Sequence, residues 1–397
     1  MTRFKRRMLI GLGVILLLLA GLGFLAYKFY LSPTSYALQR AEAFLFRRMQ
    51  VARLSLEGEY RFFFITNRRP MSTAGPVEER FGTEREETLK FGYFDVKIEP
   101  TLGLGIIINP TEWFQNEEIK LKAVGELDQA AFIEQMQALV DKSPQRSLMV
   151  VVHGFREAFP SALRKTTFIG HVLDINSPVL LFDWPGNQGS SPSGYQRARQ
   201  VAKESAPDLA RSLELTIRDI RPDRLWLIAN SMGAQVVVDA FRLLYDQADL
   251  ADTETEIKDV VLTAPDVDYN EFDEKFRHAL EALAKKTTIY VSSNDRALLA
   301  SRILNRGRRR GESTLTPRQL ETAVRVADLD PNAEGVNVVD VTPVNRTRNF
   351  HNFSLETPEF FDDLYLRLTN AETPRSRLIY PVQAPNGTVY WILTRGR

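Results

Sequence analysis

From residue 147 onwards, short apolar runs alternate with longer segments whose apolar positions recur at helical spacing. A short apolar run bounded by polar residues is typical of a strand that is covered on both faces. Strands that alternate with helices form a mostly parallel sheet with helices packed against it. This pattern predicts an α/β fold with strands at Leu148–Val152, Val179–Phe182, Leu225–Ala229, Val260–Thr263, Thr287–Ser292 and Val336–Val341, and helices at Ala206–Ile220 and Phe272–Ala284.

The segment before this alternation has a β-rich pattern. Its polar stretch over residues 67–88 is interpreted as turn-rich. A helix is expected at Ala130–Met136, shortly before the alternation begins. The apolar runs predict strands at Glu59–Thr66, Phe91–Ile98, Gly103–Ile108 and Ile119–Val124. We therefore expect an N-terminal β-rich extension over residues 55–125, followed by an α/β catalytic domain over residues 126–370.

The C-terminus has a hairpin pattern. Two apolar runs, Leu378–Val382 and Thr388–Leu393, flank Pro385-Asn386-Gly387. Asn-Gly between strand-like runs favours a tight hairpin turn. Residues 371–397 are therefore expected to form a C-terminal β-hairpin.

The N-terminus carries a long apolar run, Met8–Ala26, after a basic cluster at residues 3–7. The run is long enough to cross a hydrocarbon core of ~30 Å at about 1.5 Å per residue. We interpret residues 1–30 as a basic flank and an uncleaved transmembrane anchor, and residues 31–54 as a stalk or docking helix. A cleaved signal peptide is the alternative. The basic flank predicts a single-pass protein with a cytoplasmic N-terminus and a periplasmic or extracytoplasmic catalytic domain.

Composition narrows the possible chemistry. The chain has 397 residues, a net charge of +1, four histidines and no cysteine. A near-neutral charge argues against a general nucleic-acid binder. The lack of cysteine excludes disulfides, cysteine-ligated zinc and a cysteine nucleophile. The few histidines argue against a histidine-rich metal site, and we expect no metal or organic cofactor.

The stretch from Asp223 to Gln235 joins a predicted strand to a helical pattern through Ser231. Small residues lie two positions to either side of this serine, Ala229 and Gly233. This is a one-position variant of the pattern in which a tight strand-to-helix turn exposes a nucleophilic serine. The small residues are needed because the backbones of strand and helix nearly touch there. Ser231 is therefore the predicted nucleophile.

Another predicted strand ends in His153-Gly154-Phe155, at the sheet edge where parallel strands present their carboxyl ends. In hydrolases with such a serine, an oxyanion hole combines the amide after the serine with an amide from this earlier turn. The backbone amides of Met232 and Phe155 are the candidates. We interpret His153 as a structural residue that shapes the turn.

A serine nucleophile needs an imidazole base and a carboxylate that orients it. His351 is the predicted base, because it lies late in the chain between the last core strand and a helical pattern. Asp295 is the preferred acid, since it follows a strand directly and completes the chain order Ser, Asp, His. Asp266 and Asp268, one strand earlier, remain alternative acids, although a loop-shaping role is favoured for both.

Taken together, His153-Gly154-Phe155, Ala229–Gly233, Ser292–Asp295 and Arg348–His351 resemble the α/β-hydrolase superfamily. More narrowly, the chain resembles the esterase-like bacterial family called domain of unknown function 900. Phe64–Arg68, Phe91–Tyr93 and Phe182–Pro185 are also similar to that family's motifs. The resemblance spans about residues 60–367 and implies a serine hydrolase. Members usually carry histidine before the nucleophile, where this chain has Asn230, and the difference bears on substrate preference more than on catalysis.

The sequence therefore predicts a membrane-anchored serine hydrolase that cleaves an ester-type acyl bond in a small-molecule or lipid-like substrate. A serine amidase or peptidase is the nearer alternative, because the same three residues cleave both bonds. A non-catalytic membrane-tethered binding or scaffold protein on the same fold is the more distant one. The basic run Arg302–Arg310 is interpreted either as a solvated loop or as a contact for an anionic substrate or lipid headgroups.

Overall fold

A computed structural model describes residues 11, 13–21, 49–71, 76–98, 119–246, 257–313, 324–325, 329–330, 333–347, 351–369, 377–383 and 389–394. Most of the expected anchor, residues 31–48 of the expected stalk, the strand expected at Gly103–Ile108 and the turn at Pro385–Gly387 lie outside these residues. Within them, no helix is long and apolar enough to cross a membrane. From Met49 the chain forms turns and then a strand at Arg53–Ser55, so a stalk helix does not extend to residue 54.

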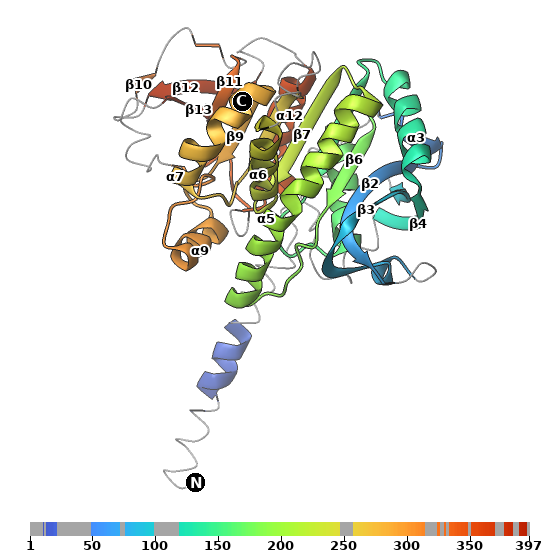
Figure 1. The fold of residues 1–397 in the computed structure, drawn as a ribbon. Helices are drawn as coiled ribbons and strands as arrows, with labels where there is room; N and C mark the ends of the chain where they lie inside the picture. Colours follow the sequence, from blue (N-terminus) through green and yellow to red (C-terminus); the bar gives the residue numbers. More distant parts are fainter. Residues whose placement is uncertain are drawn as a thin grey trace.

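A single twisted sheet runs through the molecule (Figure 1), in the order β10-β12-β13-β11-β9-β8-β7-β5-β6-β2-β3-β4, with β1 on β2. The eight central strands from β13 to β2 are parallel, whereas both edges are antiparallel. The strands are β1 (Arg53–Ser55), β2 (Glu59–Pro70), β3 (Phe81–Ile98), β4 (Ile119–Leu127), β5 (Ser147–Val152), β6 (Val179–Asp183), β7 (Arg224–Asn230), β8 (Ile257–Thr263), β9 (Ala284–Val291), β10 (Val324–Arg325), β11 (Gly335–Asp340), β12 (Ile379–Gln383) and β13 (Val389–Leu393).

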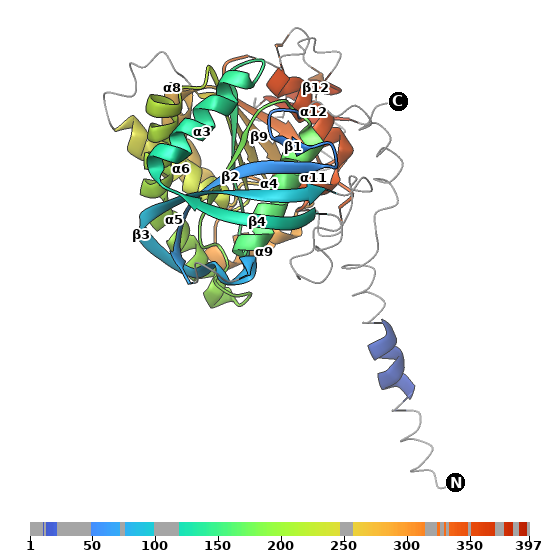
Figure 2. The same ribbon diagram turned by 90° about the vertical axis from the view of Figure 1, so that its right-hand side faces the viewer.

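Helices cover both faces of this sheet, as Figure 2 shows from the side. Side chains of α3, α5, α6 and α8 build one apolar core, and those of α4, α11 and α12 build the other. The helices are α3 (Gln129–Lys142), α4 (Phe159–Leu173), α5 (Pro192–Leu215), α6 (Gly233–Tyr245), α7 (Tyr269–Glu271), α8 (Arg277–Leu283), α9 (Arg296–Asn305), α11 (Phe353–Glu356) and α12 (Pro358–Thr369). The predicted helix-covered parallel sheet is thus confirmed.

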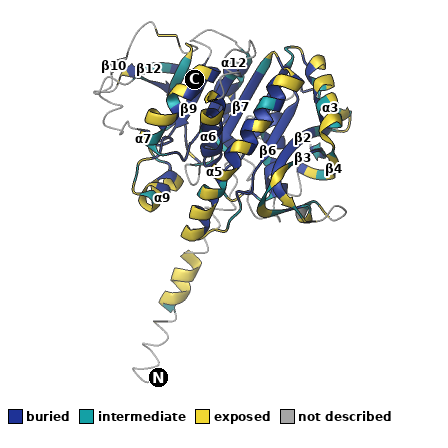
Figure 3. Cartoon of the chain, viewed as in Figure 1, coloured by how far each residue is buried: buried dark blue, intermediate teal, exposed yellow. Residues whose placement is uncertain are grey.

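The central strands are predictable because both of their faces are buried (Figure 3). In β5, Leu148, Val150 and Val152 enter the core under α5 and α6. Met149 and Val151 enter the core under α4 and α12. Successive side chains of a strand point to opposite faces, so an unbroken apolar run fills two cores at once.

The turn-rich interpretation of residues 67–88 is wrong for residues 67–70 and 81–88, which belong to strands. β2 continues to Pro70 and β3 begins at Phe81. The polar residues here are compatible with strands for two reasons. Some are paired inside the protein, such as Asn67 with Asp208. Others lie in the first half of β3, where residues 82–90 are exposed or half-buried. Polar strands of this kind lack the apolar alternation from which strands are recognised.

Candidate active site

Ser231 lies in the turn between β7 and α6 with a φ of 52°. A positive φ is costly for a serine and marks a strained backbone that its surroundings must hold in place. Here the amide of Ser231 donates to the carbonyl of Thr263 at 2.9 Å. Its carbonyl accepts from the amides of Asp266 and Ala234, at 3.0 and 3.1 Å. The serine is therefore held rigidly at the carboxyl end of the sheet.

The requirement for small residues around this turn has a direct cause. A Cβ atom at Gly233 would lie 2.3 Å from the carbonyl oxygen of His153 and 2.8 Å from that of Val152. Helix α6 thus begins in contact with the backbone of β5. On the strand side of the turn, Ala229 is fully buried. The predicted turn geometry is present, with alanine in the position that glycine usually holds.

Asp295 and His351 meet at the same edge of the sheet. Asp295 follows β9 and begins α9, where its Oδ1 accepts from the amide of Leu298 at 2.9 Å. Its Oδ2 lies 2.7 Å from His351 Nδ1. The bond fixes the proton of a neutral imidazole on Nδ1 and leaves the lone pair on Nε2, which is the arrangement of a general base.

The electrostatic surroundings of His351 favour its protonated form. Burial alone would lower the pKa of His351, but the charge of Asp295 and the hydrogen bond to it raise the pKa overall, and the charge of Asp266 adds to the rise. Lys165 acts in the opposite direction. The imidazole is therefore prepared to take up a proton next to a buried carboxylate.

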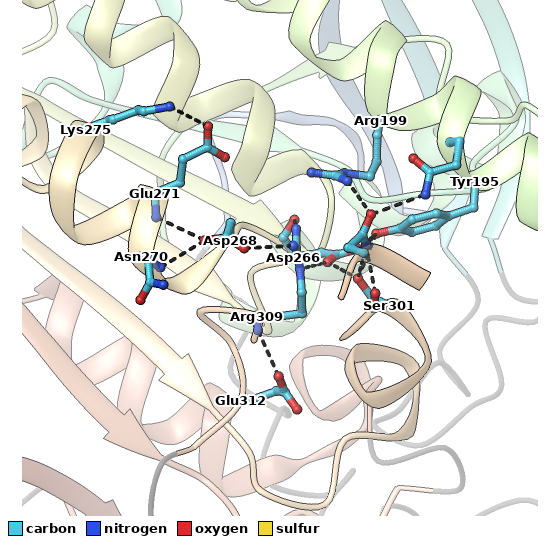
Figure 4. A network of polar contacts seen from close by, with 12 residues as sticks. Tyr195, Arg199, Asp266, Asp268, Asn270, Glu271, Lys275, Ser301, Arg309 and Glu312 are labelled. Carbon is cyan, nitrogen blue, oxygen red and sulfur yellow. Dashed lines mark hydrogen bonds and ion pairs between the residues drawn. The ribbon is translucent and has the colours of Figure 1, made fainter. Parts of the chain in front are cut away.

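The two alternative acids bind other groups. Asp266 accepts hydrogen bonds from Tyr195 Oη (2.7 Å), Ser301 Oγ (2.5 Å) and Arg309 Nε (2.7 Å), as Figure 4 shows. Asp268 accepts from the amides of residues 270 and 271, at 3.0 and 3.1 Å, and begins α7. Both carboxylates thus shape the loop after β8, whereas Asp295 is the one hydrogen bonded to His351.

The His-Gly turn after β5 packs directly on the serine. A Cβ atom at Gly154 would lie 3.2 Å from the Cβ of Ser231, a contact so tight that a larger residue would push the two segments slightly apart. The next amide, that of Phe155, and the amide of Met232 have no acceptor among the described residues. Two unused N–H groups beside a serine are what an oxyanion hole requires.

A buried ion pair supports this turn, and the sequence alone did not indicate its role. Arg68, in β2, binds Asp183 at the end of β6 at 2.7 Å, and both side chains are almost completely buried. A second nitrogen of Arg68 donates to the carbonyls of Glu157 and Trp184, at 2.8 and 2.7 Å. The guanidinium therefore fixes two loops that border the site. The signal in the sequence was Arg68, close to the apolar run of β2. Its partner Asp183 lies 115 positions away, so the sequence did not indicate the pair.

His153 belongs to the same network. Its Nε2 lies 3.0 Å from Asp183 Oδ1, its Nδ1 lies 2.9 Å from the carbonyl oxygen of Gly154, and its ring stacks on that of Trp184. Burial would raise the pKa of Asp183, but the charge of Arg68 and the contact with His153 lower it overall. The ring of His153 thus lies within the framework of the turn.

Asn230, at the position where the family resemblance implies histidine, connects the serine turn to the segment of His351. Its Nδ2 donates to Thr263 Oγ1 at 3.0 Å and to Ser354 Oγ at 3.2 Å. Ser354 lies in α11, three positions after His351. Asn230 therefore holds the segment that carries His351 against the end of β7.

Part of the basic run Arg302–Arg310 is inside the protein. Arg309 is buried against Asp266, and Arg310 is buried over the rings of Tyr269 and Phe272. Burial lowers the pKa of Arg310 below its ordinary value. The interpretation as a solvated loop is therefore wrong for Arg309 and Arg310, whose guanidinium groups hold the loop after α9 against the fold.

Within the described residues, no three histidine, aspartate or glutamate side chains gather in a way that would hold a metal ion. A family model described as an alpha/beta hydrolase of unknown function (DUF900) matches residues 128–364. A solved structure of a predicted CIB-like hydrolase from Thermoplasma acidophilum is similar, with 16% identity and a TM-score of 0.29, over 57% of this chain and 88% of that one. No curated protein matches the chain. The residues matched by the family model include Ser231, Asp295 and His351.

Proposed function

The chain belongs to this family of α/β hydrolases, and from that premise we propose that it is a membrane-anchored serine hydrolase that cleaves an ester-type acyl bond. Membership establishes a hydrolase in general terms. The finer proposal rests above all on the 2.7 Å hydrogen bond between His351 Nδ1 and Asp295 Oδ2, at the sheet edge that also carries the strained Ser231.

In the proposed reaction, Ser231 Oγ attacks the carbonyl carbon of the substrate while His351 Nε2 takes the proton. The amides of Phe155 and Met232 stabilise the oxyanion of the tetrahedral intermediate. When the carbon–oxygen bond to the alcohol breaks, His351 returns the proton to that alcohol, and an acyl-enzyme remains. Water then attacks the acyl carbonyl with His351 again as base, which releases the acid and restores the serine. Asp295 stabilises the imidazolium in both halves.

Two rivals are distinguished by experiment. A serine amidase or peptidase would use the same residues, so the comparison needs an ester and an amide with the same acyl group. We expect kcat/KM to be higher for the ester. A scaffold protein on this fold would form no acyl-enzyme at all.

Covalent labelling tests the mechanism directly. The full-length protein in detergent is treated with a fluorophosphonate probe, beside the Ser231→Ala and His351→Ala variants. We expect labelling of the parent, none of Ser231→Ala and at least about a hundredfold slower labelling of His351→Ala. Labelling that survives the loss of Ser231, or a folded parent that is never labelled, would refute the serine mechanism.

Membrane anchoring is supported by the apolar N-terminal run. Residues 13–21 are helical, and the side chains from Val14 to Leu19 are between 51% and 74% exposed. An exposed apolar surface of this kind is typical of a site that contacts a membrane or another protein. We expect the full chain to remain in the membrane fraction after an alkaline carbonate wash, and protease added outside spheroplasts to reach the catalytic domain. Release by the wash would contradict anchoring, and a product that begins after residue 30 would indicate a cleaved signal peptide.

A further inference from the structure

A cavity lies beside the serine turn, on the face of the sheet that α4, α11 and α12 cover. Three of its wall residues adjoin the reacting groups. Gly154 precedes the first oxyanion amide, Asn230 precedes the nucleophile, and Ser354 belongs to the helix that follows the base. The cavity therefore lies next to the serine turn, one residue along the chain from Ser231 and from Phe155.

The cavity is small and its walls are mostly apolar. Its cavity volume is about 30 Å³. A group the size of a water molecule needs ~10–15 Å³, so the cavity has room for about two or three such groups. A chain of about two to four carbon atoms fills this space. The apolar walls come from Val151, Ile169, Ile228, Leu355, Phe360 and Leu364.

The charged residues of the wall neutralise each other. Glu157 and Lys165 form an ion pair, and Ser161 also donates to the carboxylate. Burial would raise the pKa of Glu157, but the charge and hydrogen bond of Lys165 lower it overall, so the carboxylate of Glu157 stays ionised. A charged group on a ligand in this cavity would need an additional oppositely charged partner, because Glu157 and Lys165 already pair with each other. The cavity therefore favours a neutral occupant.

One polar group of the wall is left without a partner. Thr166 is fully buried, and its hydroxyl makes no hydrogen bond among the described residues. The neighbouring Thr167 is equally buried, but its hydroxyl donates to the carbonyl of Leu163 at 3.0 Å, and Thr167 is not part of the wall. An unpaired buried hydroxyl destabilises the fold, and a ligand with a matching polar group would recover that free energy.

We propose that this cavity binds the acyl group of the substrate, and that the acyl group is short, neutral and mainly apolar, with one hydroxyl or carbonyl that hydrogen bonds to Thr166. The inference rests on the proposed function, because the acyl carbonyl must reach Ser231. In the acyl-enzyme the new bond joins Ser231 Oγ to the carbonyl carbon, and the acyl chain extends past Gly154 into the cavity.

The size of the cavity is tested with 4-nitrophenyl acetate, butyrate and octanoate. For the parent we expect the highest kcat/KM with acetate or butyrate and a sharp decline at octanoate. Ile169→Phe fills the cavity and should lower the butyrate-to-acetate ratio at least about tenfold, since one methylene in an apolar pocket is worth roughly 10–200-fold. Ile169→Ala enlarges the cavity and should raise the octanoate-to-butyrate ratio, so a folding defect in the first variant leaves the second to decide.

The role of Thr166 is tested with a matched pair of variants, Thr166→Val and Thr167→Val. Each removes a buried hydroxyl from α4, but only Thr166 lines the cavity. We expect Thr166→Val to lower the kcat/KM ratio of 4-nitrophenyl 3-hydroxybutyrate to butyrate about tenfold, and Thr167→Val to leave this ratio within about twofold. Equal ratios in the two variants would overturn the assignment of Thr166.

Fluorophosphonate labelling of every variant separates the two proposals. If the variants are labelled through Ser231 but keep the parent's acyl-length profile, the cavity is not the acyl site and the serine mechanism stands. If butyrate esters of different alcohols respond to Ile169→Ala and the acyl series does not, the cavity holds the leaving group and the acyl assignment is wrong. If the parent itself is not labelled, the proposed function fails first.

Discussion

At the scale of single residues, Asp295 uses both oxygens of one buried carboxylate. Oδ1 accepts from the amide of Leu298 at the start of α9, and Oδ2 binds Nδ1 of His351. Because the helix start fixes the carboxylate, the imidazole is oriented by regular structure and not by a mobile loop side chain. The sequence identified this pair because an aspartate that directly follows a predicted strand must lie at the carboxyl edge of the sheet.

Asp295→Asn tests this role, with Asp266→Asn as its counterpart. Asparagine still caps a helix, so we expect Asp295→Asn to keep its fold while kcat falls about 10³–10⁴-fold. Asp266→Asn removes the partner of the buried Arg309 and should cost about 3 kcal/mol or more of unfolding free energy. Urea unfolding and esterase kinetics on both variants measure the two effects. If Asp266→Asn loses more turnover than Asp295→Asn at equal folded fraction, the acid has been assigned to the wrong loop.

The raised pKa of His351 sets a pH dependence with opposite signs for activity and stability. Because its pKa is raised in the folded protein, protonation of His351 stabilises the fold. This contribution is complete below the unfolded pKa near 6.5 and is lost as the pH rises through the higher folded value. Catalysis needs the neutral ring, so kcat/KM should rise through the same window. Rate profiles and melting temperatures against pH measure both, and a kinetic midpoint below 6.5 would contradict the expected direction.

At the scale of elements, the serine turn depends on contact between α6 and β5. Glycine to alanine inside a helix normally stabilises it by about 1 kcal/mol. At Gly233 the new Cβ would lie 2.3 Å from the carbonyl oxygen of His153, so we expect the opposite sign. Gly233→Ala should lose roughly 1–3 kcal/mol of stability and most of its turnover.

The variant Ala229→Gly is the matched control for this element. It restores the residue that usually lies two positions before the nucleophile, and it adds no atom to the turn. We expect folding at a cost of about 1 kcal/mol, with turnover close to that of the parent. Thermal unfolding and labelling rates of the two variants give the comparison. A stable and fully active Gly233→Ala protein would show that the turn relaxes more readily than its contacts indicate.

The elements that the sequence predicted well share one property, which is burial on both faces. The strand at Ser147–Val152 is an unbroken apolar run, and its position was predicted to within one residue. The strands around residues 67–88 were missed because Arg68 and Asn67 are polar yet buried, and each is paired with a carboxylate far along the chain. A local pattern cannot reveal a partner that only the folded sheet brings close. For the same reason the sequence did not indicate how Arg68 supports the turn before Phe155.

At the scale of the whole molecule, the β-rich segment over residues 55–125 is part of the sheet that carries the site. β2 pairs with β6 in parallel from Phe63 to Thr66, and its side chains contribute to both cores. Arg68 of β2 neutralises Asp183 beneath the site. The family model, in contrast, matches from residue 128 onwards. Whether residues 126–397 can fold without β2 therefore depends on how much of the free energy of unfolding this strand contributes.

We expect that residues 126–397 alone do not fold, whereas residues 49–397 in the same buffer do. Loss of Arg68 removes the permanent cation that is paired with the buried carboxylate of Asp183, at about 3–5 kcal/mol. Loss of the phenylalanines at 62–64 removes roughly 1.5–3 kcal/mol of burial for each side chain. Together these approach or exceed the 5–15 kcal/mol that holds a typical domain together. Circular dichroism melting and fluorophosphonate labelling of the two fragments measure the outcome. A cooperative melt and labelled serine in the shorter fragment would instead establish the β-rich segment as a separate unit, with a boundary near residue 126.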